Sequence, residues 1–156
     1  MIKFFNLLFI IFSISISSLE QGYSSSQNKF SLLVHKTPTC GCCKKWVNHL
    51  EANSFSTMIK DHQNLQKVKE QHSIKPKYQS CHTAVSQDGY VFEGHIPSKF
   101  IKQFLANPEV DAIGLAVPGM PLGSPGMEVE GRFMPYDVLV LHKDGSSKVY
   151  AEVREG

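Results

Sequence analysis

The sequence lacks the motifs and the charge pattern of several common functional classes. It contains no glycine-rich phosphate loop, no dinucleotide-binding fingerprint and no HExxH zinc motif, so the usual signatures of nucleotide and metalloprotease chemistry are missing. The formal net charge is only +2, and lysine and arginine form no cluster, so nucleic acid is not an expected partner. Charged residues make up 19% and hydrophobic residues 42% of the 156 residues, the balance of a folded globular chain.

Long apolar runs are absent except at the N-terminus, where the pattern is that of a secretory signal peptide. Lys3 gives a positive start, residues 4–16 are almost wholly apolar, and small serine residues follow. The run is short and interrupted by serine, which disfavours a membrane span, although an uncleaved anchor is the alternative. We predict a signal peptide over residues 1–22, one folded domain over residues 30–156, and no membrane span in the mature chain. Disulfides can persist in such an exported protein, because compartments outside the cytoplasm are oxidising.

Apolar periodicity and turn residues predict an α/β fold. We expect strands over 29–36 and 55–61, helices over 42–52, 64–74 and 96–107, two strands within 81–95, a loop over 113–136 and a hairpin over 137–153. The dipeptides Asp88-Gly89 and Asp144-Gly145 mark the two expected hairpin turns. Without the last loop and hairpin, this is the order of a thioredoxin-like core, a mixed sheet with flanking helices. The additions to that core are a Gly/Pro/Met-rich loop and a C-terminal β-hairpin.

Three of the four cysteines form the motif CGCC, at the turn between the first expected strand and helix. Cys40 and Cys43 have the C-x-x-C spacing of thiol–disulfide exchangers, and Cys42 adds a third sulfur. Amides at the start of a helix favour thiolate over thiol, and thiolates are both nucleophiles and soft metal ligands. Two structural disulfides are an alternative, but bridges within so short a turn would stabilise little. A zinc site is less favoured, because only one C-x-x-C pair is present.

The fourth cysteine precedes a later strand, in the dipeptide Cys81-His82. In a thioredoxin-like arrangement this loop faces the dithiol turn, and many exchangers have a cis-proline there. We therefore expect the four sulfurs to converge on one pocket as a metal–thiolate centre with redox capability. Among the histidines, His82 is the first candidate for an imidazole ligand, followed by His35 and His95.

Two methionines in the Gly/Pro-rich loop are further candidates. Met120 and Met127 have no helical spacing, and their thioether sulfurs suit Cu(I). Packing beneath the loop is an equally weighted alternative. Of the remaining histidines, His49 is expected in a core or capping role, and solvated positions are expected for His62, His72 and His142.

Five segments, in order, resemble one known family: TPTCGCCKKWVNHLE, SCHTAV, GYVFEGHIP, GLAVPGMPLGSPGME and PYDVLV. The chain resembles the CopG-like exported copper-resistance proteins, long catalogued as a metal-binding domain of unknown function. The resemblance implies a thioredoxin-like fold in the bacterial periplasm and a cysteine-bridged centre holding several copper ions. It also implies a role in cycling copper between Cu(I) and Cu(II). The copper thiolates would then be Cys40, Cys42, Cys43 and Cys81.

The leading prediction is thus an exported copper-binding protein for copper resistance or homeostasis, with a copper oxidoreductase activity left open. One alternative is a thiol–disulfide oxidoreductase, with Cys40 as the attacking and Cys43 as the resolving sulfur. The other is a copper chaperone that delivers its ion to a copper-exporting or copper-handling periplasmic partner.

Overall fold

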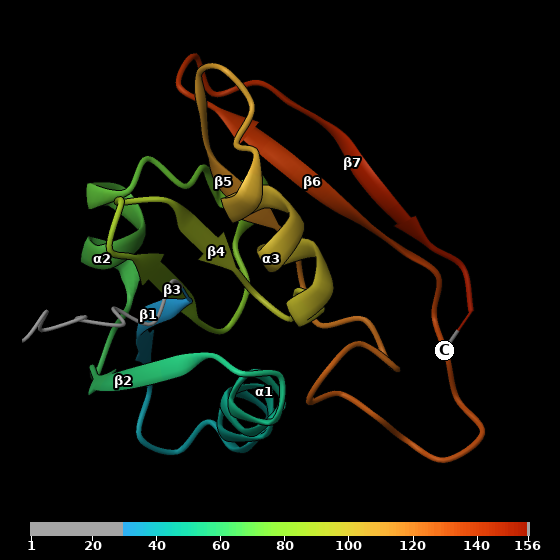
Figure 1. The fold of residues 1–156 in the computed structure, drawn as a ribbon. Coiled ribbons are helices and arrows are strands. Elements are labelled where there is room, and N and C mark those ends of the chain that lie inside the picture. The colour runs from blue at the N-terminus through green and yellow to red at the C-terminus, as the bar shows by residue number, and fades with distance from the viewer. Residues whose placement is uncertain (1–29, 156) are drawn as a thin grey trace, which may run out of the picture.

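The computed structural model describes residues 30–155 (Figure 1). The predicted signal peptide, residues 1–22, lies outside this range. In chain order the elements are β1 (Ser31–Lys36), α1 (Gly41–Ala52), β2 (Ser56–Asp61), α2 (Gln66–Gln71), the 3-10 turn η1 (Pro76–Tyr78), β3 (Thr83–Ser86), β4 (Val91–Glu93), α3 (Ser98–Ala106), β5 (Ala112–Ala116), β6 (Tyr136–His142) and β7 (Ser147–Val153). Within the described range, no helix has the length and apolar character that crossing a membrane requires.

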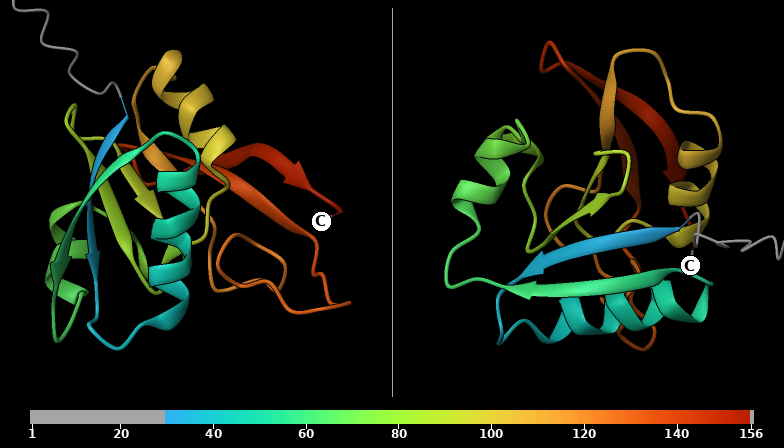
Figure 2. Two further views of the ribbon diagram at one scale, coloured as in Figure 1. Left: turned by 60° about the horizontal axis from the view of Figure 1, so that its bottom comes forward. Right: turned by 60° about the vertical axis from the view of Figure 1, so that its left-hand side comes forward.

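The strands form one seven-stranded mixed sheet in the order β2-β1-β3-β4-β5-β6-β7. β1 pairs parallel with β2 and antiparallel with β3, and β3 pairs antiparallel with β4. Helices α1 and α3 lie on one face of the sheet and α2 lies on the other (Figure 2). These four strands and three helices are the predicted thioredoxin-like core. The hairpin of β6 and β7 is also confirmed, with its turn at Gly145.

Strand β5 corrects the expected loop over residues 113–136. It pairs parallel with β4 and antiparallel with β6, so it connects the core to the C-terminal hairpin. A Cβ at Gly114 would lie 1.8 Å from the carbonyl oxygen of Val91, so only glycine lets the two strands approach this closely. The sequence AIGLA gave a weak strand signal because glycine and alanine are poor strand formers. The loop that remains runs over residues 117–135.

The helices follow the apolar periodicity of the sequence. In α1, Trp46, Val47 and Leu50 are buried against the sheet, as predicted. The helix begins one residue earlier than expected, with Cys40 as its N-cap. Helix α2 is shorter than the predicted 64–74, because Ser73 adopts a positive φ of 58° and turns the chain away.

The strand directions bring the candidate ligands to one edge of the sheet. Because β3 is antiparallel to both β1 and β4, the strands β1, β2, β4 and β5 all run in the same direction. We call the edge at which these four strands end the carboxyl edge. The CGCC turn, His95 and the methionine loop follow β1, β4 and β5 there, and Cys81-His82 enters β3 from the same edge. Segments up to 87 residues apart thus meet at this edge, as between Cys40 and Met127.

Candidate metal centre

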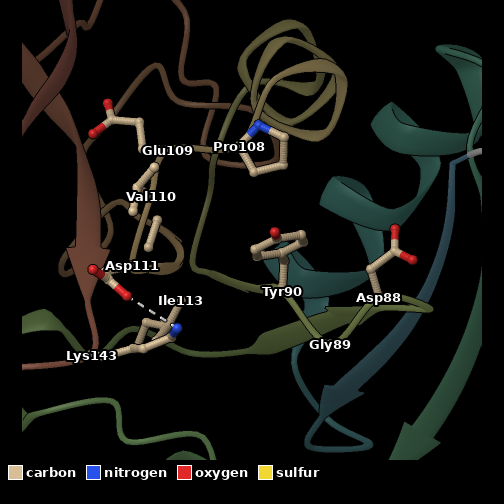
Figure 3. A pocket seen from close by; sticks show the side chains of 10 residues that line it. Asp88, Gly89, Tyr90, Pro108, Glu109, Val110, Asp111, Ile113 and Lys143 are labelled. Atoms are coloured by element: carbon tan, nitrogen blue, oxygen red, sulfur yellow. Dashed lines mark hydrogen bonds and ion pairs between the residues drawn. The ribbon is translucent and has the colours of Figure 1, made fainter.

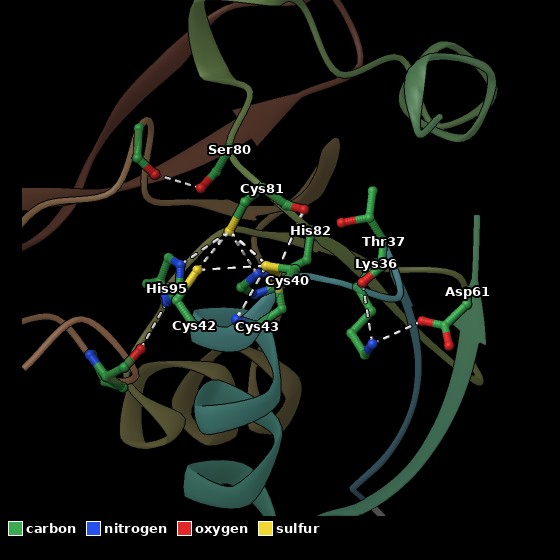
Figure 4. Close-up of a disulfide and its surroundings, with 12 residues drawn as sticks. Lys36, Thr37, Cys40, Cys42, Cys43, Asp61, Ser80, Cys81, His82 and His95 are labelled. Carbon is green, nitrogen blue, oxygen red and sulfur yellow. Dashed lines mark hydrogen bonds and ion pairs between the residues drawn. A yellow bond between two sulfur atoms is a disulfide. The ribbon is translucent and has the colours of Figure 1, made fainter. Parts of the chain in front are cut away.

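The sulfurs of Cys40, Cys42, Cys43 and Cys81 all lie within 4.8 Å of one another (Figure 4). The Cys42 sulfur lies 3.5 Å from that of Cys40, and the Cys81 sulfur lies 3.4 Å from that of Cys43. Cys42 and Cys81, the two cysteines from different loops, are 3.9 Å apart at sulfur. The expected convergence of two loops on one pocket is therefore what the fold produces.

Two of these sulfurs are joined. Cys40 and Cys43 form a disulfide, and Cys42 and Cys81 are free. Cys43 is fully buried, whereas Cys40 is partly exposed at the N-terminus of α1. The Cys43 amide donates a hydrogen bond to the Cys40 sulfur at 3.3 Å, an interaction that also stabilises a thiolate there. Two electrons must reduce this bridge before all four sulfurs can act as thiolates.

The free thiol of Cys81 lies in a protected environment. Burial and the neighbouring Cys42 raise the pKa of the Cys81 thiol to about 12. A metal ion that binds this sulfur must therefore displace its proton, and metal affinity rises with pH for this reason. A thiol held protonated in this way is a poor nucleophile, and it becomes a soft ligand only when the ion displaces its proton.

His95 contacts the Cys81 sulfur from the end of β4. Its Nε2 lies 3.1 Å from Cys81 Sγ, and its Nδ1 lies 2.8 Å from the carbonyl oxygen of Pro125. A carbonyl only accepts, so Nδ1 carries the proton and donates it, which leaves the Nε2 lone pair facing the sulfur. Burial lowers the pKa of His95, so the ring is a neutral donor. This is the arrangement of a metal-ligating histidine fixed by a backbone carbonyl.

His82 supplies the second imidazole next to Cys81. Its Nδ1 lies 3.3 Å from Cys81 Sγ, and its ring packs against Trp46 at a tilt of 39° with centroids 4.2 Å apart. The ring is fully buried, and burial lowers its pKa well below the usual value. Among residues 30–155, His82 Nε2 has no hydrogen-bond partner. Together, Cys81, His82 and His95 form a second converging set of donors that shares a sulfur with the first.

A buried ion pair holds the loop that carries Cys81. Glu93, which is fully buried, forms an ion pair with Lys69 of α2. The same carboxylate accepts hydrogen bonds from the Ser80 amide at 2.6 Å and from the Thr83 hydroxyl at 2.6 Å. These two donors lie directly before and after Cys81-His82. Glu93 therefore fixes both ends of the segment that presents the fourth sulfur.

The methionine loop packs over the start of α1. A Cβ at Gly126 would lie 2.7 Å from the carbonyl oxygen of Cys42, and the φ of Gly126 is +87°, so glycine is required for this contact. Half-buried Met127 then lines a hollow of about 320 Å³ together with Gly41 and Cys42. Met120 is 51% exposed and follows Gly119, whose amide donates to Gln79 near the Cys81 loop. Each methionine thus lies beside one of the two cysteine-bearing loops.

Three other histidine predictions have clear outcomes. His49 has the expected capping role, since its Nε2 accepts a hydrogen bond from the Ser98 amide at the start of α3. His35 is not at the sulfur cluster; its Nδ1 lies 2.8 Å from Nε2 of His62. His62 is partly exposed, in line with the solvated position expected for it, and its Nε2 faces His35.

A surface hollow of about 440 Å³ lies away from the cysteines (Figure 3). It is lined by residues 88–90 of the β3–β4 turn, residues 108–113 and Lys143, which pairs with Asp111 at 3.2 Å. These segments lie at the edge of the sheet opposite the carboxyl edge. The described residues that line this hollow include no cysteine or histidine.

Two solved structures match the chain over most of its length. They are described as copper resistance protein copG, Form 1 and Form 2. The alignment with Form 1 has 40% identity and a TM-score of 0.75, and covers 81% of this chain and 98% of that one. Form 2 also gives 40% identity and a TM-score of 0.75, with 80% and 98% covered.

A family model described as "Protein of unknown function, DUF411" matches residues 78–127, the segment from Tyr78 to Met127 that contains Cys81 and both histidines next to it. No curated protein matches the chain. Because the two solved structures are 40% identical to the chain over about four-fifths of its length, the chain belongs to the family of the CopG copper-resistance proteins.

Proposed function

We propose that this chain is an exported copper-binding protein in which Cys40, Cys42, Cys43 and Cys81 bind Cu(I) as thiolates, with roles in copper resistance. The observation that carries the proposal is the convergence of four sulfurs within 4.8 Å. Sulfur ligands select soft ions such as Cu(I), and bridging sulfurs allow more than one ion to bind. The names of the two solved relatives, copper resistance proteins, support the choice of copper.

The donors beyond sulfur extend the proposal. His95 and His82 offer neutral imidazoles next to Cys81, at 3.1 Å and 3.3 Å from its sulfur. The His82 nitrogen that faces the Cys81 sulfur is Nδ1, so Nδ1 would be its ligating atom. Met127 lies beside Cys42 and adds a thioether sulfur, and Met120 lies beside the Cys81 loop. We assign the two imidazoles as direct ligands of copper. We assign the two methionines to the periphery of the centre, beside the cysteine loops.

Export through the signal peptide of residues 1–22 to the periplasm belongs to the same proposal. The Cys40–Cys43 disulfide supports it, because such bridges persist in oxidising compartments. The bridge also implies that copper capacity depends on the redox state of the protein. Only the reduced form offers all four thiolates.

The test is the number of copper ions bound per chain after reduction and anaerobic reconstitution. We expect more than one Cu(I) per chain in the native protein and a clear loss in Cys42→Ser and Cys81→Ser. Met127→Leu tests the role assigned to the loop methionine, and Met58→Leu is its matched control, because Met58 is 61% exposed on β2. Fewer than one copper per chain, unchanged in both serine variants, would refute the proposal. Parallel loading with Zn(II) separates copper from the zinc alternative.

The disulfide favours a second function, thiol–disulfide exchange. Cys40 is partly exposed and Cys43 is fully buried, as expected for an attacking and a resolving cysteine. Insulin reduction without added metal, abolished in Cys40→Ser, would establish this activity. Delivery of copper to a partner, and cycling between Cu(I) and Cu(II), stay predictions that transfer assays and redox titrations address.

A further inference from the structure

A pair of histidines at the carboxyl edge lies outside the donor sets that contain cysteine. His35 is the penultimate residue of β1, and His62 directly follows β2. The parallel pairing of these strands sets Lys60 opposite His35, so His62 lies just beyond that rung. His35 Nδ1 and His62 Nε2 are 2.8 Å apart, and the ring centroids are 5.0 Å apart. Neither residue takes part in the clusters around Cys81.

The pair lies on the face of the sheet opposite the cysteine helix. Leu32 and Val34 of β1 are part of the core with α1 and α3. Successive side chains of a strand point to opposite faces, so His35 points to the face covered by α2. His35 is 8% exposed, and His62 is half-buried beside it. The α2 face thus has its own nitrogen donors.

The separation of the two nitrogens suits a metal ion. With metal–imidazole bonds of about 2.0–2.1 Å, two ligands at a right angle lie about 2.9 Å apart, whereas tetrahedral ligands lie about 3.4 Å apart. The observed 2.8 Å is the length of a hydrogen bond, and it is also close to the separation of neighbouring positions in a square or tetragonal site. Cu(II) prefers that geometry and imidazole donors.

We propose that His35 and His62 form a second metal site, which binds Cu(II) through two imidazole nitrogens on the α2 face. The choice of copper rests on the proposed function, whereas the geometry of the two imidazoles is independent of it. One proton joins the two rings in the hydrogen bond. When the ion binds, the donating ring shifts that proton to its other nitrogen, so both facing nitrogens offer lone pairs without net loss of a proton.

The charges around the pair set its character. Burial, with His62, His72 and Lys60 nearby, lowers the pKa of His35 to about 4, so its ring is neutral at neutral pH. The positive charge of Lys60 opposes the bound ion, so we expect Lys60→Gln to tighten the site.

The test uses a variant in which the free thiols cannot bind or reduce Cu(II). In full-length Cys42→Ser/Cys81→Ser protein with the Cys40–Cys43 bridge intact, one equivalent of Cu(II) is added. Electron paramagnetic resonance and electron spin echo modulation then count the equatorial imidazole nitrogens. We expect two nitrogens in this parent and, after His62→Gln, loss of that signature with binding weakened at least about tenfold.

His142→Gln is the matched control, since His142 ends β6 at the opposite edge of the sheet, and it should change nothing. Circular dichroism verifies the fold of each variant, and His35→Gln repeats the test from the second ring. Equal Cu(II) binding in the parent and in His62→Gln, or no Cu(II) in the parent, would overturn the proposal and leave a structural hydrogen bond. Cu(I) loading of reduced protein carrying only His62→Gln should stay at the native value, so this site and the thiolate centre can fail separately.

Discussion

The buried pair of Lys69 and Glu93 leads to a quantitative prediction. Lys69→Met removes one partner and leaves Glu93, which is fully buried, without its counter-ion. Breaking a buried pair from one side costs about 3–5 kcal/mol. With an m value of about 1.5 kcal/mol/M, this displaces the urea midpoint by about 2–3 M. Lys143→Met is the control, because Lys143 and Asp111 are 68% and 70% exposed and such pairs contribute about 0–1 kcal/mol.

The same variant has a characteristic pH dependence. Burial already raises the pKa of Glu93, and Lys69 opposes that rise, so its removal raises the pKa further. The folded variant then takes up a proton, and its stability falls as pH rises above the ordinary pKa of a glutamate. Lys69→Met should therefore be closer to the native protein at pH 5 than at pH 8. Lys69→Met/Glu93→Gln should recover most of the loss. If Lys69→Met and Lys143→Met shift the urea midpoint equally, the pair does not hold the Cys81 loop as argued.

Three further predictions concern the carboxyl edge. Gly126→Ala should lower the free energy of unfolding by about 1–3 kcal/mol, because Gly126 has a positive φ and a Cβ there would contact Cys42. Gly41→Ala is the control and should be neutral, because the space around Gly41 is open. Equal urea midpoints for the two variants would contradict this. His95→Gln should weaken Cu(I) binding at least about tenfold in competition with a chromophoric chelator, and an unchanged affinity would remove this ring from the ligands. The pKa of His35 is lowered to about 4 in the folded protein. Between this value and the ordinary pKa of 6.5, the unfolded chain binds a proton that the folded chain does not. The free energy of unfolding should therefore fall as pH drops from 6.5 towards 4, by up to about 1.4 kcal/mol per pH unit. Urea unfolding of His35→Gln across that range should have a shallower slope, and an identical slope would assign the effect to other groups.

Local patterns in the sequence predicted much of the fold. The spacing of Trp46, Val47 and Leu50 gave α1, and the Asp-Gly dipeptides gave both hairpin turns. Strand β5 was missed because its central glycine is required by contact with Val91, a partner 23 residues earlier that no local pattern reveals. The signal that could have found it is the short apolar run AIGLA before the Gly/Pro-rich segment.

The sequence likewise predicted part of the candidate site and missed another part. The CGCC spacing and the thioredoxin-like order predicted that the sulfurs would meet, but spacing alone left open which of them would be bridged. The sequence made both His35 and His95 candidate imidazole ligands of the sulfur centre. In the fold, only His95 contacts Cys81, and His35 contacts His62. Strand direction and register decide these pairings, and single-sequence periodicity fixes neither for residues 14 to 27 positions apart.

The concentration of donors at one edge leaves the other edge available for practical use. The turns at Asp88-Gly89 and Asp144-Gly145 both lie there, beside the hollow of Figure 3. Exposed turns of this kind tolerate insertions and attachments. A fluorophore, an affinity peptide or a link to an electrode at either turn would suspend the protein with its sulfur and imidazole end facing the solution.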